Sequence, residues 1–361
     1  MNARRLAAAL AVVALAAWPP AVRAQVDTGT CFVRDFRFRS GETLPELKLH
    51  YMTMGRPRKD ATGVVLNAVL ILHGTTGSGR QFLSPLFTEL YGAGEALDTA
   101  THYVIFPDGI GHGASSKPSD GLHARFPHYT YDDMVAAQHV LLTGCLSVNH
   151  LLLVMGTSMG GMHTWVWGET YPDFMDGLVP LASLPTAIAG RNRMMRKMIL
   201  DDIRNDPAWR GGDYATEPPG LREAMQLFFV MTSAPLVQQR QGPTRDSADA
   251  FIERYLDDGV RSHDANDVMY AFDASRDYDP SVALERIQAP LLAINSADDF
   301  INPPELGIVD SLIRRVPKGR YVLIPIGPLT RGHGTHTVAA AWKQYFAPFV
   351  AGLERKAGVR D

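Results

Sequence analysis

Apolar residues gather along this chain in short runs, and longer segments of helical pattern separate them. The runs have the near-continuous character of strands that are buried on both faces of a parallel sheet. They occupy 64–72, 103–106, 151–155, 177–184, 290–295 and 321–325. Helical patterns follow at 130–142, where Thr130 is the expected N-cap, and at 304–315 and 335–352. The alternation predicts an α/β fold with a mostly parallel central sheet flanked by helices.

Two segments depart from this alternation. Polar and apolar residues alternate over 31–53, with a break at Ser40-Gly41, which predicts an N-terminal antiparallel hairpin. Between 185 and 280 the strand pattern stops, and helical segments rich in Met, Arg and Asp take its place. We interpret 185–280 as a helical cap inserted into a core domain made of 25–184 and 281–361. Catalytic residues are then expected on loops at the carboxyl ends of the strands.

The first 24 residues have the pattern of a targeting segment. Arg4 and Arg5 precede an apolar stretch at 6–18, and Val22-Arg23-Ala24 is a small-x-Ala cleavage site before Gln25. The stretch is too short to span a bilayer, so we expect a cleaved signal peptide and no stable membrane anchor. The predicted location is the bacterial periplasm or the outside of the cell.

Composition excludes some functions and leaves others open. The chain has 361 residues and a net charge of −3, and no basic run suits nucleic acid. Its only cysteines, Cys31 and Cys145, form one disulfide in an oxidising compartment or are two small buried side chains. Two cysteines are too few for a structural zinc site, and the histidines have no ligand spacing. Neither a metal nor an organic cofactor is implied.

The most informative motif is Gly156-Thr157-Ser158-Met159-Gly160, which lies between an apolar strand and an apolar helix. A G-x-S-x-G sequence in this context is the nucleophile elbow of serine hydrolases. The two glycines allow a tight, strained turn that lifts the Ser158 hydroxyl off the sheet. Ser158 is therefore the predicted nucleophile.

An acid and a base follow later in the chain, each just after a predicted strand. Asp298 and Asp299 compete for the role of acid, and the Asp-x-Ile/Val-x-Pro spacing of related folds favours Asp299. His333 and His336 compete for the role of base, and His333 has the expected position between a glycine and the closing helix. The order Ser, Asp, His is that of the α/β-hydrolase fold.

These residue types predict an acyl-transfer mechanism on a small-molecule acyl substrate. His333 takes the proton of Ser158, and Asp299 fixes the imidazole tautomer. Backbone N–H groups of Met159 and of Thr75, in the loop after His73-Gly74, are the expected oxyanion-hole donors. A non-catalytic binding protein needs none of these groups, whereas a cofactor-free lyase or a peptidase on this fold stays open.

Beyond the elbow, the chain resembles the homoserine O-acetyltransferase family through nearly all of its predicted mature length. The similar motifs are Gly156 to Met162 with Trp167 and Tyr171-Pro172-Asp173, His73-x-x-Thr76-Gly77, Asp264-Ala265-Asn266, Asp277-Tyr278-Asp279-Pro280, and Asp299 before Pro303-Pro304. The resemblance implies the α/β-hydrolase fold, and it implies a homodimer formed through the cap helices.

The resemblance has two gaps. The family has an Asp after the catalytic His that helps to hold the amino group of homoserine, and here that position is Gly334. The family has a stretch of the Gly-Ser-Thr-Gly-Pro type. Here residues 108–118 replace it, and their sequence is similar to the corresponding stretch of ordinary α/β hydrolases. Loss of a charged partner for a buried ammonium costs several kcal/mol, and export separates the protein from cytoplasmic acetyl-CoA. We therefore expect an esterase-like hydrolase that uses water, with O-acyl transfer to an alcohol as the alternative.

Overall fold

The computed structural model describes residues 25–357, so the predicted signal peptide lies outside the described residues. The strands are β1 (Val26–Arg37), β2 (Thr43–Met54), β3 (Ala68–Leu72), β4 (Tyr103–Pro107), β5 (Leu153–Thr157), β6 (Leu178–Leu181), β7 (Leu291–Ser296) and β8 (Gly319–Ile324). The α-helices are α1 (Pro85–Thr88), α2 (Tyr131–Val140), α3 (Met159–Thr170), α4 (Gly190–Arg204), α5 (Pro219–Thr232), α6 (Pro235–Gln241), α7 (Arg245–Ser262), α8 (Ala265–Asp273), α9 (Ile308–Leu312) and α10 (Ala339–Ala357).

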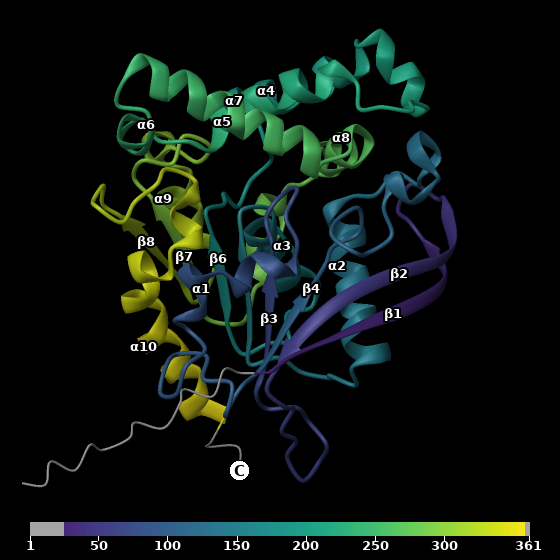
Figure 1. Cartoon of the computed structure of the whole chain (residues 1–361). Coiled ribbons are helices and arrows are strands. Elements are labelled where there is room, and N and C mark those ends of the chain that lie inside the picture. Colours follow the sequence, from purple (N-terminus) through teal and green to yellow (C-terminus); the bar gives the residue numbers. More distant parts are fainter. Residues whose placement is uncertain (1–24, 358–361) are drawn as a thin grey trace, which may run out of the picture.

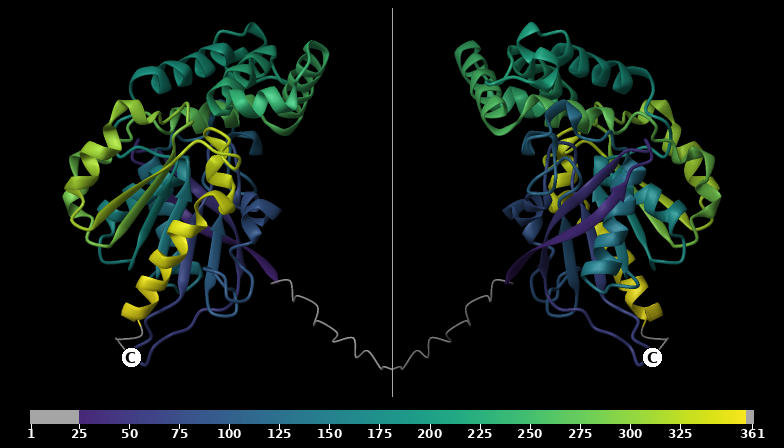
Figure 2. Two further views of the ribbon diagram at one scale, coloured as in Figure 1. Left: turned by 90° about the vertical axis from the view of Figure 1, so that its left-hand side faces the viewer. Right: turned by 90° about the vertical axis from the view of Figure 1, so that its right-hand side faces the viewer.

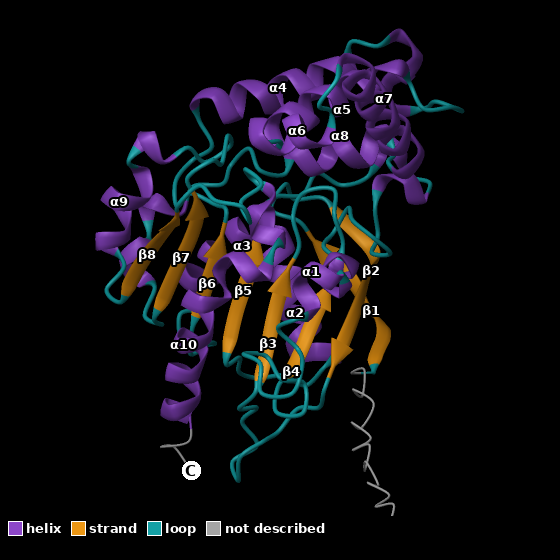
Figure 3. Ribbon diagram, turned by 60° about the vertical axis from the view of Figure 1, so that its left-hand side comes forward, coloured by secondary structure: helices purple, strands orange, loops and turns teal. Residues whose placement is uncertain are grey.

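The strands form one sheet in the order β1-β2-β4-β3-β5-β6-β7-β8 (Figures 1 and 3). β1, β2 and β4 pair antiparallel, and every pairing from β4 to β8 is parallel. The predicted fold class, a mostly parallel sheet flanked by helices, is confirmed.

Each face of the sheet packs against its own apolar core. Successive strand residues point to opposite faces, so Val69 and Ile71 enter one core while Leu70 and Leu72 enter the other. The first core contains the aromatic side chains of α1 and α10, and the second contains those of α2 and α3. Burial on both faces explains why the strands read as continuous apolar runs.

Helices α4 to α8 follow β6 and lie together over the end of the sheet to which the parallel strands point (Figures 2 and 3). Helix α4 packs against α5 and α8, and α5 packs against α7. Met195, Ile199 and Met225 are buried in this packing, which accounts for part of the methionine content of the segment. The cap therefore faces the edge at which functional loops are expected.

Several element boundaries differ from the sequence prediction. The predicted strand at 177–184 ends at Leu181, because Ala182 turns the chain with φ 51°. The predicted helix at 304–315 is divided at Gly307, which has φ 62° and separates a short 3-10 turn from α9. Thr130 does cap α2, with reciprocal hydrogen bonds to Asp133.

Cys31 and Cys145 form a disulfide, which decides between the two alternatives left open by the sequence. It joins β1 to the segment that follows α2, and the two Cα atoms lie 5.9 Å apart.

Within residues 25–357, no helix has the length and apolar character needed to cross a membrane.

Candidate active site

Ser158 lies in the sharp turn between β5 and α3. Its φ of 57° and ψ of −112° are unusual for a residue with a side chain, and such strain is typical of a nucleophile elbow. The turn requires its two glycines. A Cβ on Gly156 would lie 2.1 Å from the carbonyl oxygen of Gly160, and a Cβ on Gly160 would lie 2.0 Å from that of Leu72. Close backbone packing therefore places the partly exposed Ser158 at the carboxyl edge of the sheet.

The structure brings the three predicted catalytic side chains into one hydrogen-bonded chain. Ser158 Oγ lies 2.7 Å from His333 Nε2, and His333 Nδ1 lies 2.9 Å from Asp299 Oδ2. His333 and Asp299 are buried. Because Nδ1 faces a carboxylate, it carries the proton, and Nε2 is free to accept one from the serine.

Asp299 is held as an ion by its surroundings. Its Oδ1 accepts backbone N–H bonds from Ile301 (2.8 Å) and Asn302 (3.1 Å), and its Oδ2 accepts one from Asn302 Nδ2 (3.0 Å). Burial alone would raise the pKa of Asp299, but the charge of His333 and the hydrogen bonds from His333 and Asn302 outweigh burial and lower it.

The competing candidates lie close by and have other partners. Asp298 Oδ2 accepts the backbone N–H of Gly332 at 2.9 Å, and its Oδ1 accepts the hydroxyl of Ser296. Asp298 thus ties the loop that carries His333 to the end of β7. His336 packs edge-on against His333, and burial together with the charge of His333 lowers the pKa of His336 to about 3. The structure places neither candidate in hydrogen-bond contact with Ser158.

The oxyanion-hole donors were predicted in two segments that the structure brings beside Ser158. Met159 is the first residue of α3 and directly follows the serine. The loop with Gly74 and Thr75 lies against the turn, because a Cβ on Gly74 would be 3.5 Å from Ser158 Cβ. His73 fixes this loop, since its Nδ1 donates to the Gly74 carbonyl (2.8 Å) and its Nε2 accepts from Gly109 N–H (2.9 Å). Burial lowers the pKa of His73, which keeps this neutral tautomer.

Gln81 is a functional candidate that the sequence analysis missed. Its Oε1 accepts the backbone N–H of Gly74 at 3.3 Å, and its Nε2 donates to Thr157 Oγ1 at 2.9 Å. Gln81 therefore bridges the oxyanion loop to the residue before Ser158. No sequence signal marked it, because it lies in a short 3-10 turn and its partner is 76 positions away.

Arg196 is a second residue that the sequence did not single out. Its buried guanidinium donates to Asn192 Oδ1 (3.0 Å) and Ser275 Oγ (3.1 Å), which are both neutral. Burial lowers the pKa of Arg196, and the nearby phenol of Tyr131 opposes that effect. The bond to Ser275 connects α4 to the segment that follows α8.

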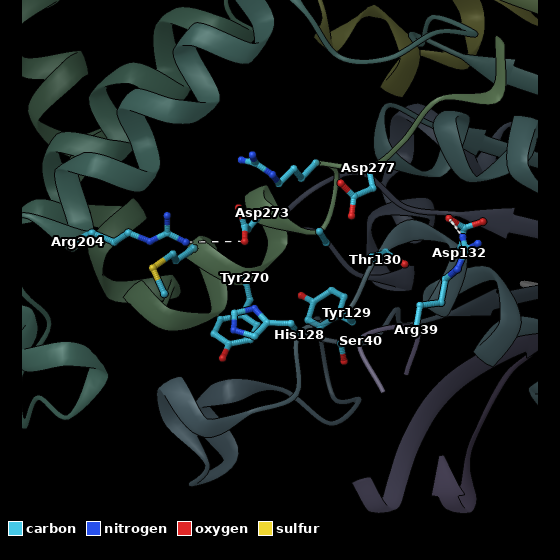
Figure 4. Close-up of a pocket in the computed structure, with 13 residues that line it drawn as sticks. Arg39, Ser40, His128, Tyr129, Thr130, Asp132, Arg204, Tyr270, Asp273 and Asp277 are labelled. Carbon is cyan, nitrogen blue, oxygen red and sulfur yellow. Dashed lines mark ion pairs between the residues drawn. The ribbon is translucent and has the colours of Figure 1, made fainter. Parts of the chain in front are cut away.

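A polar cavity of about 490 Å³ lies between the hairpin, α2 and the cap, away from these residues (Figure 4). Its charges neutralise one another in part, since Arg39 pairs with Asp132, and Arg204 lies 3.8 Å from Asp273. Within residues 25–357, no cluster of His, Cys, Asp and Glu side chains is arranged to hold a metal ion.

Comparisons of the sequence with known proteins agree on one family. Residues 67–325 match the alpha/beta hydrolase fold family. A probable acyltransferase of Methanothermobacter thermautotrophicus is 30% identical over 81% of this chain and 88% of its own length. A homoserine O-acetyltransferase of Pelobacter propionicus is 33% identical over 74% of this chain and 81% of its own length.

Solved structures agree in fold. The structure of esterase E22 superposes with a TM-score of 0.79 at 21% identity, covering 90% of this chain and all of that one. Homoserine O-acetyltransferase from Bacillus anthracis superposes with a TM-score of 0.78 at 22% identity, covering 90% of this chain and 97% of that one. The chain belongs to the α/β-hydrolase-fold family, within the group that includes the homoserine O-acetyltransferases.

Proposed function

We propose that this protein is an exported serine hydrolase that cleaves an ester or a similar acyl compound through an acyl-Ser158 intermediate. The observation that carries the proposal is the unbroken hydrogen-bonded chain from Ser158 through His333 to Asp299. Its three members come from three separate loops at one edge of the sheet, as an acyl-transfer site on this fold requires.

The proposed reaction has two halves. Ser158 Oγ attacks the acyl carbon while His333 Nε2 accepts its proton, and the negative oxygen meets the N–H groups of Met159 and Thr75. His333 then protonates the leaving alcohol, and acyl-Ser158 is left behind. Water attacks this ester, gives its proton to His333 and releases the carboxylic acid as the proton returns to Ser158.

The second candidate function is O-acyl transfer, in which an alcohol replaces water in the second half. The observation in its favour is the similarity to proteins named acyltransferase and homoserine O-acetyltransferase. The glycine at position 334 instead favours water as the acceptor of the acyl group. A Cβ there would meet only Arg331 Cβ, at 3.8 Å, so the space beside His333 can hold a side chain but Gly334 supplies no carboxylate for an amino group.

The disulfide supports the export part of the proposal. Disulfides persist in oxidising compartments such as the bacterial periplasm and are rare in the cytosol. Cys31 and Cys145 are the only cysteines of the chain, and both take part in the bond.

One experiment tests both candidate functions. The chain from Gln25 is incubated with p-nitrophenyl acetate, with and without L-homoserine, beside a Ser158→Ala control. Free acetate as the product in both mixtures, and none from the control, is the expected result. O-acetylhomoserine formed at the expense of acetate would establish the transferase instead, and full turnover by Ser158→Ala would reject the acyl-serine mechanism.

A further inference from the structure

A cavity of about 800 Å³ lies next to the candidate active site, between the loop after β7, the turn after β6 and the start of α4. We refer to it as the acid-loop pocket, because Asp298 and Asp299 lie in its wall. Most of the wall is apolar, and the largest of its aliphatic side chains are Met162, Leu184, Ile188, Ile301, Leu306 and Ile308. Pockets of this volume and character typically hold small organic molecules.

Two residues of the pocket wall, Met162 and Asp299, are neighbours of the proposed catalytic residues, whereas Ser158 and His333 lie outside the wall. Met162 lies one helical turn after Ser158 on α3, and its N–H bonds to the Ser158 carbonyl at 2.9 Å. Asp299, which is also in the wall, is separated from Ser158 by the single imidazole of His333. A substituent on the acyl carbon at Ser158, or on its leaving oxygen, would therefore enter the pocket only if it is long enough to pass Met162 or the imidazole of His333.

Two large apolar side chains of the pocket wall are partly exposed to solvent. Phe300 is 37% exposed and Leu306 is 57% exposed, although both are large apolar side chains. Arg191 of α4 donates to the Phe300 carbonyl at 2.7 Å and places its guanidinium 3.6 Å from the Phe300 ring centre. This contact joins the cap to the acid loop at the pocket, where a bound apolar group would cover the exposed side chains.

The charges of the wall argue against an anionic ligand. Asp298, Asp299 and Glu305 contribute three carboxyl groups, and Arg191 is the cation in the wall. Asp298 and Asp299 are already engaged with the loop of His333 and with His333 itself. Glu305 and Arg191 then contribute one charge of each sign, so the wall has no net charge left to pair an ionic ligand and suits a neutral, hydrophobic group.

We infer that the acid-loop pocket binds a bulky hydrophobic group of the substrate, so that the protein prefers esters with a long or aromatic substituent. The inference rests on the proposed function for its chemistry. The substituent belongs either to the acyl chain or to the alcohol, and the two origins are separated by experiment.

Two ester series provide the test. The first varies the acyl chain of p-nitrophenyl esters from acetate to octanoate, and the second varies the alcohol of acetates from methyl to 2-naphthyl. Each buried methylene should raise kcat/KM about fourfold in the series whose varied group enters the pocket. The series that responds identifies the origin of the group, and a flat response in both series overturns the inference.

Substitutions in the wall link this preference to the pocket. Ile188→Asn and Leu306→Asp place polar groups in the wall, and each should lower the ratio of kcat/KM for the largest ester to that for the smallest about tenfold. The matched control is Met198→Asn, because Met198 is 52% exposed on α4 and lies outside the wall. Folded Ile188→Asn and Leu306→Asp proteins that keep the wild-type ratio would overturn the inference.

A binding measurement separates this inference from the proposed function. 2-Naphthol is titrated into the Ser158→Ala protein by calorimetry, with and without Ile188→Asn. Binding to the Ser158→Ala protein that Ile188→Asn abolishes, together with no ester cleavage by the wild-type protein, would refute the proposed function and support the apolar site. Ester cleavage that depends on Ser158 but not on substituent size or Ile188 would support the function and refute the inference.

Discussion

The same substitution, Asp to Asn, should have very different effects on catalysis at the adjacent residues Asp298 and Asp299. Replacement of Asp by Asn keeps the shape of the side chain but exchanges one acceptor oxygen for a donor NH2 group. At position 299 the oxygen that faces His333 is Oδ2, while Oδ1 accepts two backbone N–H groups, from Ile301 and Asn302. In the Asp299→Asn variant the amide oxygen must stay at the place of Oδ1, because two donors converge there.

The NH2 group of the Asp299→Asn variant would then face Nδ1 of His333. Nδ1 must become an acceptor, so the proton moves to Nε2, which can no longer take the proton of Ser158. Such a tautomer reversal lowers kcat about 10⁴-fold, or about 5.5 kcal/mol. The same NH2 group also meets the Asn302 Nδ2 donor, now 3.0 Å from Oδ2, which adds a lost hydrogen bond of about 1 kcal/mol to the folding free energy.

Asp298→Asn disturbs less. Its partners are the N–H of Gly332 and the hydroxyl of Ser296, and that hydroxyl can turn to accept from an amide. The change costs about 1 kcal/mol of hydrogen bonding, or less than about tenfold in kcat/KM.

The assay is steady-state hydrolysis of p-nitrophenyl acetate by both variants, with thermal melts to confirm folding. Equal losses in the two variants would refute the assignment of roles, and a larger loss for Asp298→Asn would reverse it. If Asp299→Asn stayed within tenfold of wild type, the tautomer argument itself would be wrong.

Three further changes test other parts of the structure. Gln81→Leu removes the bridge to Thr157 and should lower kcat at least about tenfold with little change in KM, measured with the same ester; a rise in KM alone would contradict a positioning role. The double variant Cys31→Ala/Cys145→Ala removes the disulfide and opens a loop closed across 114 residues. The free energy of unfolding, measured in urea, should then fall by about 4.8 kcal/mol, and a fall of less than about 1 kcal/mol would refute the chain-entropy argument. His112 lies buried in the loop after β4, where its Nδ1 donates to the Ile110 carbonyl at 2.8 Å. Burial lowers the pKa of His112 from 6.5 to about 3, so its contribution to stability is complete above pH 6.5 and is lost as the pH falls toward 3, by about 2 kcal/mol at pH 5. Urea unfolding at pH 7 and pH 5 should show that His112→Asn removes this part of the pH dependence, and an unchanged dependence would be the contrary result.

The strands were predictable because burial on both faces leaves a continuous apolar run in the sequence. Their ends were not, since a single backbone angle decides them. The strand predicted to reach residue 184 stops because Ala182 adopts φ 51°, and the predicted helix at 304–315 breaks at Gly307 with φ 62°. Neither angle leaves a mark on hydrophobic periodicity, although a glycine within a helical pattern is a weak warning.

The candidate triad was predictable for a different reason. Ser158, Asp299 and His333 each follow a strand at the same edge of the sheet, so topology alone brings their loops together. Interactions that join distant segments through one side chain left no such signal. The bonds of Gln81 to Gly74 and Thr157 depend on the exact approach of two loops, and sequence does not encode that approach in any local pattern.

The choice between water and an alcohol depends on the space around His333 more than on the triad, because hydrolysis and transfer share the same acyl-serine. An alcohol must be bound to compete with water for this intermediate. A charged acceptor such as an amino acid needs an unoccupied carboxylate to pair its ammonium group, since burial of an unpaired charge costs several kcal/mol. The two carboxylates of the acid loop, Asp298 and Asp299, are already engaged with the loop of His333 and with His333 itself, and position 334 is glycine. These residues of the site therefore favour water over a charged acceptor, and the apolar acid-loop pocket is the feature that we propose sets substrate preference.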